Sequence, residues 1–195
     1  GDLAAPREYR PASCGDRTPG RPKGLSGMAA LSQDEAFARI RLLRSPNVGP
    51  VSYRQLLRRF GTAIAALDAL PDLAGRGGGA YRPAPEQRVV DEVNALRAAG
   101  ARYLFHDGAD YPALLTELDT APPILMVRGD VALARRPCVA IVGARNASAN
   151  GRRLATQIAR DLGAEGFVIV SGLARGIDAC AHDAALDTGT IAVLA

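Results

Sequence analysis

Residues 139–151 read VAIVGARNASANG, and residues 167–178 read FVIVSGLARGID. Each stretch begins with an apolar run, passes through a glycine-containing turn and ends where a helical pattern starts. We predict strands at 138–143 and 167–171, helices at 150–164 and 177–186, and a further strand opening at 190–195. This alternating order predicts a parallel sheet with right-handed crossovers, in a Rossmann-like, doubly wound α/β fold.

The two turns between strand and helix share a composition that suits anions. In an open parallel sheet the ligand binds beyond the carboxyl ends of the strands, close to helix N-termini. Glycine permits close approach, serine offers a hydroxyl, and arginine offers a planar fork to phosphate oxygens. We therefore expect the turns to form one phosphate-binding pocket from Gly143, Arg145, Ser148, Ser171, Gly172, Arg175 and Gly176.

The same turns lack the signatures of nucleotide-dependent enzymes. Neither turn is GxGxxG, and no P-loop lysine motif is present. Asp178 and His182 have the spacing to pair on one helix, but a catalytic pair needs a nucleophile or water beside it. We favour an acid stabilised by the helix dipole, with a partly buried histidine nearby. We expect no catalytic residue, no metal and no cofactor; for each glycine, a plain turn former is the alternative.

The N-terminal half has helical patterns instead. Ser32 and Glu35 form a predicted capping box, followed by an apolar face that ends before Ser45. A turn around Gly49, a residue that can take positive φ, leads into a helix at 51–60. The two helices suggest a helix-hairpin-helix whose second helix offers N–H groups to a DNA phosphate. We favour the alternative, a helical corner packed against Ile64, Leu67 and Leu70.

The segments that follow are a loop, a helix and short strands. Glycines and prolines at 75–85 predict a loop, and the next helix, at 86–99, has the apolar stripe Val89, Val93 and Leu96. Apolar segments at 101–105 and 124–127 predict two short strands.

Composition narrows the class of protein. The chain has 195 residues, 48% of them hydrophobic, and a formal net charge of +4, which permits an anionic partner without demanding one. Cys14, Cys138 and Cys180 are too widely spaced for a disulfide framework or a zinc site. No apolar run is long enough for a membrane span, and residues 1–28 lack the apolar core of a secretory signal. We expect a cytoplasmic protein with a disordered leader, continuing beyond Ala195 because the last strand has no covering helix.

Together these motifs resemble the DNA-processing protein A family (DprA, also called Smf). The carrying segments are 139–145 with Ser148 and Gly151, and 171–178 with Ala181-His182 and Ala185-Leu186; Tyr111-Pro112 and Pro122-Pro123 are similar to the family's lead-in to its Rossmann domain. One departure is Ala144, where the family often has Ser or Thr.

Composition predicts a leader at 1–28. The resemblance, which covers about 31–195, implies a helical SAM-like domain at 29–100 and the N-terminal portion of an extended Rossmann-like domain at 101–195. It also implies a non-enzymatic protein that binds and protects single-stranded DNA, loads the RecA recombinase during natural transformation and dimerises through the Rossmann domain. Arg145 is then the leading candidate for phosphate contact.

A second hypothesis is a nucleotide- or nucleoside-phosphate-binding enzyme similar to the phosphoribohydrolases. Those enzymes carry an acidic catalytic residue in a PGGxGTxxE-type segment, which this sequence lacks. A scaffold with purely structural turns is the third.

Overall fold

Helices fill the first part of the structure. The computed structural model describes residues 31–75 and 81–194, so the predicted leader at 1–28 lies outside the described residues. The helices are α1 (Gln33–Arg44), α2 (Pro50–Phe60), α3 (Ala63–Gly75) and α4 (Glu86–Ala98). The predicted ends of α1, α2 and α4 are confirmed to within two residues, whereas α3 was not predicted as a helix. The predicted loop at 75–85 lies partly outside the described residues.

The start of α1 differs from the predicted capping box. Ser32 is the N-cap, and its hydroxyl accepts the Glu35 N–H at 3.1 Å. The reciprocal bond is missing, because the Glu35 carboxylate accepts the Ala63 N–H at 2.8 Å and the Arg39 guanidinium at 3.1 Å. Glu35 therefore joins α1 to the start of α3 instead of closing its own helix.

In the turn before α2, the positive φ belongs to Asn47 and not to Gly49. Asn47, with φ 59°, takes the left-handed conformation, and Gly49 has φ −92°. Asparagine tolerates this region because its short polar side chain can bond locally. Gly49 is the N-cap of α2, and Pro50 occupies the first helical position, where a missing N–H costs nothing.

The helical part encloses its own core, consisting of Ala38, Leu42, Val48, Tyr53, Ala63, Ala66, Leu67 and Leu70. Leu67 and Leu70 were predicted to pack here, and this is confirmed; Ile64 is 44% exposed, so that part of the prediction was wrong. In α4, Val89 is fully buried while Val93 and Leu96 are only partly so.

An antiparallel pair follows the helices. Strands β1 (Ala101–Phe105) and β2 (Ile124–Arg128) pair along their full length, from Ala101 opposite Arg128 to Phe105 opposite Ile124. Short helix α5 (Ala113–Thr116) lies in the connection, and the 3-10 helix η1 (Val131–Arg135) leads on toward the next sheet.

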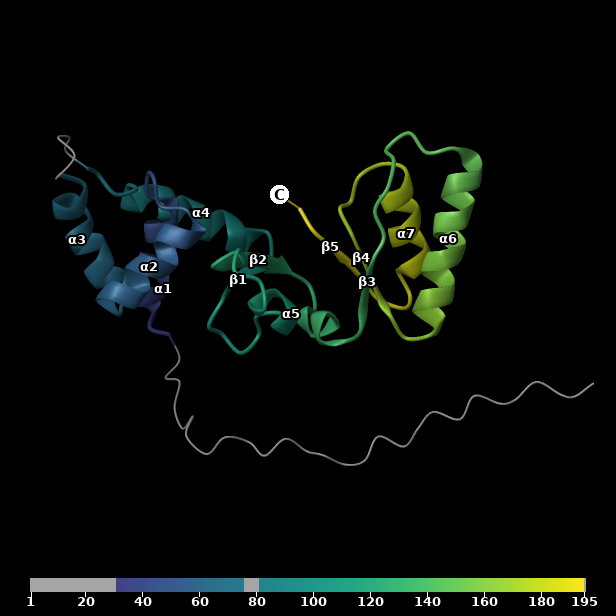
Figure 1. Cartoon of the computed structure of the whole chain (residues 1–195), viewed down its shortest axis with the longest axis horizontal. Helices are drawn as coiled ribbons and strands as arrows, with labels where there is room; N and C mark the ends of the chain where they lie inside the picture. The colour runs from purple at the N-terminus through teal and green to yellow at the C-terminus, as the bar shows by residue number, and fades with distance from the viewer. Residues whose placement is uncertain (1–30, 76–80, 195) are drawn as a thin grey trace, which may run out of the picture. The chain divides into compact units, whose positions relative to one another are not determined.

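The C-terminal sheet is parallel, with strand order β3-β4-β5, as predicted. Its elements are β3 (Cys138–Ala140), α6 (Ala149–Ala164), β4 (Val168–Ser171), α7 (Ile177–Ala185) and β5 (Thr190–Ala192). Helices α6 and α7 pack together and both contact β4, so they lie on one face of the sheet (Figure 1). The fold class, a helical domain followed by an α/β region with a parallel sheet, is confirmed.

Strand burial in this sheet depends on position. Val168 and Ile169 of β4 are fully buried, but β3 and β5 are only partly buried because each pairs on one side only among the described strands. The predicted strand at 138–143 ends three residues early, since the chain leaves the ladder soon after the Ile141 N–H donates to the Val170 carbonyl at 2.9 Å. Within 31–75 and 81–194, no helix is both long and apolar enough to cross a bilayer.

Candidate phosphate-binding site

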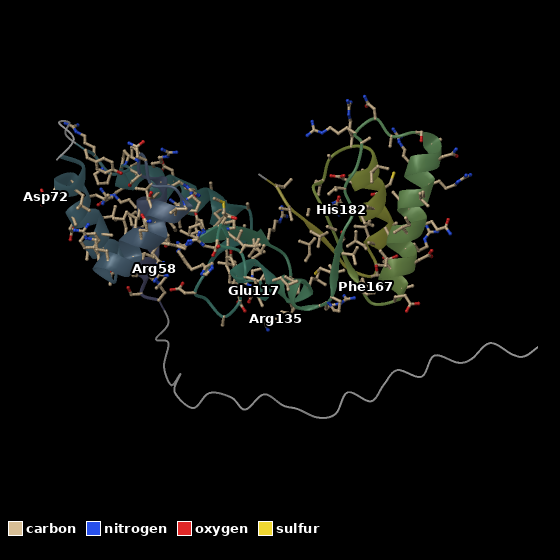
Figure 2. All side chains as sticks on the ribbon, in the orientation of Figure 1. Arg58, Asp72, Glu117, Arg135, Phe167 and His182 are labelled. Atoms are coloured by element: carbon tan, nitrogen blue, oxygen red, sulfur yellow. The ribbon has the colours of Figure 1, made fainter. Side chains whose placement is uncertain are left out.

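The predicted turns lie at the same edge of the sheet. Residues 141–148 follow β3 and residues 172–176 follow β4, and the strands are parallel, so both turns emerge from their carboxyl ends. In Figure 2, side chains with nitrogen at their tips project outward from the loop that joins β3 to α6. Arg145 and Arg175, one on each turn, are both exposed.

The two turns are in direct contact through Gly176. Its φ is +91°, and an added Cβ would collide with the Ala144 carbonyl oxygen and lie 2.6 Å from the Arg145 carbonyl oxygen. The next residue, Ile177, donates its N–H to the Ala144 carbonyl at 3.3 Å. Only glycine permits this backbone approach, so Gly176 allows the second turn to rest on the first.

The Asp178 carboxylate forms a hydrogen bond to each of the two turns. It lies in the first turn of α7 and is 6% exposed. One carboxylate oxygen accepts the Gly143 N–H at 3.3 Å, and the other accepts the Gly172 N–H at 3.2 Å. The helix-dipole interpretation placed Asp178 correctly in α7, but sequence reasoning missed this bridge. The available signal was an acid in the first turn of a helix, with a glycine directly after the preceding strand.

The bridge changes what the predicted residues can offer to a ligand. The N–H groups of Gly143 and Gly172 are already paired with Asp178. The Ser171 side chain is 3% exposed, and its hydroxyl donates to the Ile141 carbonyl at 2.6 Å, so it supports the turn from within. The Ser148 hydroxyl caps α6 by accepting the Gly151 N–H at 3.1 Å and keeps its own hydrogen for another partner.

His182 does not pair with Asp178. The histidine, labelled on α7 in Figure 2, is 7% exposed, and its Nδ1 lies 2.7 Å from the Thr190 hydroxyl oxygen. That hydroxyl donates its single hydrogen to the Ile169 carbonyl at 2.9 Å, so Nδ1 must be the donor to threonine. His182 therefore joins α7 to β5, and the predicted interpretation as a partly buried structural histidine fits this geometry.

The groups left at the surface of the turns are cationic. Arg145 and Arg175 make no side-chain hydrogen bond or ion pair with any residue in the described part of the chain. Residues 141–160 contain Arg145, Arg152, Arg153 and Arg160 and no acidic residue. The three α6 arginines are also exposed, which extends the positive surface from the turn along α6 as far as Arg160, where the exposed Asp161 follows.

The arginines of α2 form a different pattern. The Arg54 guanidinium donates to the backbone carbonyls of Asp119 and Ala121, so it is engaged within the fold. Arg59 lies over the Phe60 ring, 5.2 Å from its centroid, and Arg58 is exposed. Among 31–75 and 81–194, no group of three or more His, Cys, Asp or Glu side chains is placed to hold a metal ion.

Comparison with known proteins gives two family matches. A family described as "DNA recombination-mediator protein A" matches residues 102–195, and a "DprA-like N-terminal HHH domain" matches residues 33–95. Protein Smf of Synechocystis sp. is 35% identical over 162 residues, which cover 75% of this chain and 40% of that protein. The DNA processing protein DprA of Streptococcus pneumoniae is 45% identical over 86 residues, covering 43% of this chain and 30% of that protein.

A solved structure is similar as well. The X-ray structure of DprA from Streptococcus pneumoniae aligns with a TM-score of 0.58 and 28% identity, covering 81% of this chain and 57% of that one. The chain thus spans less than two thirds of the length of each of these relatives.

Proposed function

Because the chain belongs to the DprA/Smf family of DNA recombination mediators, we propose that it is a cytoplasmic protein that binds the phosphates of single-stranded DNA without catalysing a reaction. The observation that carries the proposal is the pair of exposed, unpaired guanidinium groups of Arg145 and Arg175, on turns in contact at the carboxyl ends of β3 and β4. Arginine forks bind phosphate oxygens in two-point geometry, so two of them on one support suit a polyanionic backbone.

The positive charge of α6 favours a nucleic-acid strand over a mononucleotide as the ligand. Arg152 and Arg153 are the fourth and fifth residues of α6, and Arg160 lies two turns further along. A mononucleotide would engage the turns alone, whereas a strand that leaves the turns can follow these side chains. The Ser148 hydroxyl and the N-terminus of α6 add donors where the strand would pass.

The proposal extends to two partners. The first is RecA recombinase, which the protein would load onto incoming DNA during natural transformation. The family resemblance of the motifs at 139–151 and 171–178 supports this interaction. Homodimerisation through the Rossmann-like domain has the same support. The proposed domain division, at residue 100, agrees with the separation of the two family matches at 95 and 102.

Removal of the two guanidinium groups tests DNA binding. In the full chain, Arg145→Ala and Arg175→Ala should each lower the affinity for a single-stranded oligonucleotide about tenfold, the effect of losing one charged hydrogen bond. The slope of log affinity against log salt should become shallower by about 0.7 for each phosphate that is no longer neutralised. Fluorescence anisotropy at several salt concentrations measures both quantities.

Arg97→Ala is the matched control, because it removes the same charge from an exposed position on α4, a helix that is not part of the proposed DNA path. Its affinity should stay within about twofold of the wild type at 0.15 M salt, where screening acts over about 8 Å. Unchanged binding by the Arg145→Ala, Arg175→Ala double variant would place the site elsewhere. Release of free base from nucleoside monophosphates would favour the phosphoribohydrolase hypothesis instead.

A further inference from the structure

We propose that Asp178 is a positioning residue for DNA binding: its buried carboxylate never touches DNA but fixes the spacing of the two arginine-bearing turns. This inference rests on the proposed function and deepens it. The exposed arginine side chains of the turns then bind the phosphate, while the N–H groups of Gly143 and Gly172 bind the Asp178 carboxylate.

The geometry gives Asp178 one bond to each turn. Its two oxygens accept the N–H groups of Gly143 and Gly172 at 3.3 and 3.2 Å. A carboxylate is rigid and planar, so two groups bonded to its two oxygens keep a fixed separation. Arg145 and Arg175 each follow their glycine closely, and their backbone positions therefore depend on this one side chain.

The glycines bring the turns close enough to be bridged. An added Cβ at Gly172 would lie 3.0 Å from the second Asp178 oxygen, and one at Gly143 would lie 2.7 Å from the Ile177 side chain. Both glycines thus permit the approach of the α7 N-terminus to the turns. With the Gly176 contact, the turns are held at two points, which fixes their relative orientation as well as their distance.

Neutralising the Asp178 charge would change DNA affinity in opposite directions under an electrostatic role and under a positioning role. Within the described residues its carboxylate has no ion-pair partner, and its compensation comes from two backbone N–H groups and the N-terminus of α7. Charge alone predicts that neutralising this anion strengthens DNA binding, because repulsion of the phosphates is relieved. Positioning predicts the opposite, because the turns lose their shared anchor.

Asp178→Asn separates these two outcomes. Asparagine has nearly the same shape, but its amide nitrogen cannot accept a hydrogen bond, so only one of the two N–H groups keeps its partner. We expect an affinity for single-stranded DNA about tenfold lower than wild type, comparable to the loss of one charged hydrogen bond. Asp183→Asn, an exposed acid on the same helix, loses the same charge and should bind DNA as well as wild type or slightly more tightly.

A double-mutant cycle distinguishes positioning from a general loss of stability. If Asp178 acts through the arginines, Asp178→Asn should change affinity less than twofold in the Arg145→Ala, Arg175→Ala background, because coupled residues are not additive. Circular dichroism establishes that each variant is folded. Faster hydrogen exchange at the Gly143 and Gly172 amides should accompany the loss of affinity.

Gly172→Ala provides a second variant that keeps the charge. Its added methyl group would lie 3.0 Å from one Asp178 oxygen, so the carboxylate must shift by a few tenths of an ångström and its bond to the Gly172 N–H weakens. DNA affinity should fall, by less than in Asp178→Asn. The inference is overturned if folded Asp178→Asn binds DNA like Asp183→Asn, or if Gly172→Ala binds like wild type, while the paired arginine variant still loses affinity. Wild-type binding by that arginine variant would instead overturn the proposed function.

Discussion

Leu173 occupies a backbone conformation that leucine rarely adopts. Its φ is 57°, in the left-handed region, and its side chain is 57% exposed. For a residue with a Cβ this conformation costs about 1–2 kcal/mol. The neighbouring bonds impose it, because the Gly172 N–H is held by Asp178 and the Ala174 carbonyl accepts the Ala179 N–H at 3.0 Å. Such strain persists only where the surroundings determine it, and here it lies beside Arg175.

Leu173→Gly should therefore leave the free energy of unfolding unchanged or raise it by up to about 1 kcal/mol, since relief of strain offsets the greater unfolded-chain entropy of glycine. Leu186→Gly is the matched control: Leu186 is 68% exposed but has helical φ, −56°, and should lose about 0.5–1 kcal/mol. Urea denaturation measures both. Equal destabilisation of the two variants would mean that the turn stores no strain at Leu173.

Among the elements, α1, α4 and β1 meet at one carboxylate. Glu92 of α4 accepts two bonds from the Arg44 guanidinium, at 2.8 and 2.9 Å, and a third from the Tyr103 hydroxyl at 2.9 Å. Burial raises the pKa of the Glu92 carboxyl, but the bonds from Arg44 and Tyr103 lower it more, so its net pKa lies below the ordinary value of 4.5. Burial, followed by the hydrogen bond to Glu92, raises the pKa of the Tyr103 hydroxyl.

Glu92→Gln should destabilise the protein by about 2 kcal/mol at pH 7, where charged hydrogen bonds are lost. An acid with a depressed folded pKa stabilises above its unfolded pKa, and this contribution disappears as pH falls through the folded pKa. The difference between variant and wild type should therefore be full above pH 4.5 and shrink below it, as measured by urea denaturation across pH 3–7. Glu86→Gln, whose acid is 68% exposed, should cost less than about 1 kcal/mol; a difference for Glu92→Gln that stays constant down to pH 3 would contradict the assignment.

The elements were predictable where their signals are local. Ser32 and Ser148 are caps that mark helix starts directly, and the apolar runs before each glycine predicted β3 and β4. Helix α3 was missed because Pro71 and the following glycines resemble a loop, while tertiary burial of Leu67 and Leu70 stabilises the helix. The Asp178 bridge joins Gly143 to a residue 35 positions later in the sequence, and no local pattern encodes that contact.

At the scale of the whole molecule, the placement of charge matters more than its sum. The net charge is only +4, yet residues 141–160 are basic without an acidic residue, and α7 carries Asp178 and Asp183. Because screening confines each exposed charge to about 8–10 Å at 0.10–0.15 M salt, distant arginines contribute little to a site at the sheet edge. Affinity for DNA should then follow the location of each arginine and not the total charge.

Two double variants that lose the same charge at different places test whether location or total charge sets DNA affinity. Arg58→Ala with Arg59→Ala removes two exposed arginines from α2, and Arg145→Ala with Arg175→Ala removes two from the turns. The α2 variant should keep the wild-type dependence of log affinity on log salt, whereas the turn variant should lose about 1.4 from that slope, two phosphates at about 0.7 each. Salt titrations with one fluorescent single-stranded oligonucleotide give both slopes. Equal losses of slope in the two variants would show that α2 also binds DNA, as the helix-hairpin-helix interpretation of the turn at 47–51 requires. A slope that is unchanged in the turn variant but shallower in the α2 variant would place the phosphate site in the helical domain and not at the sheet edge.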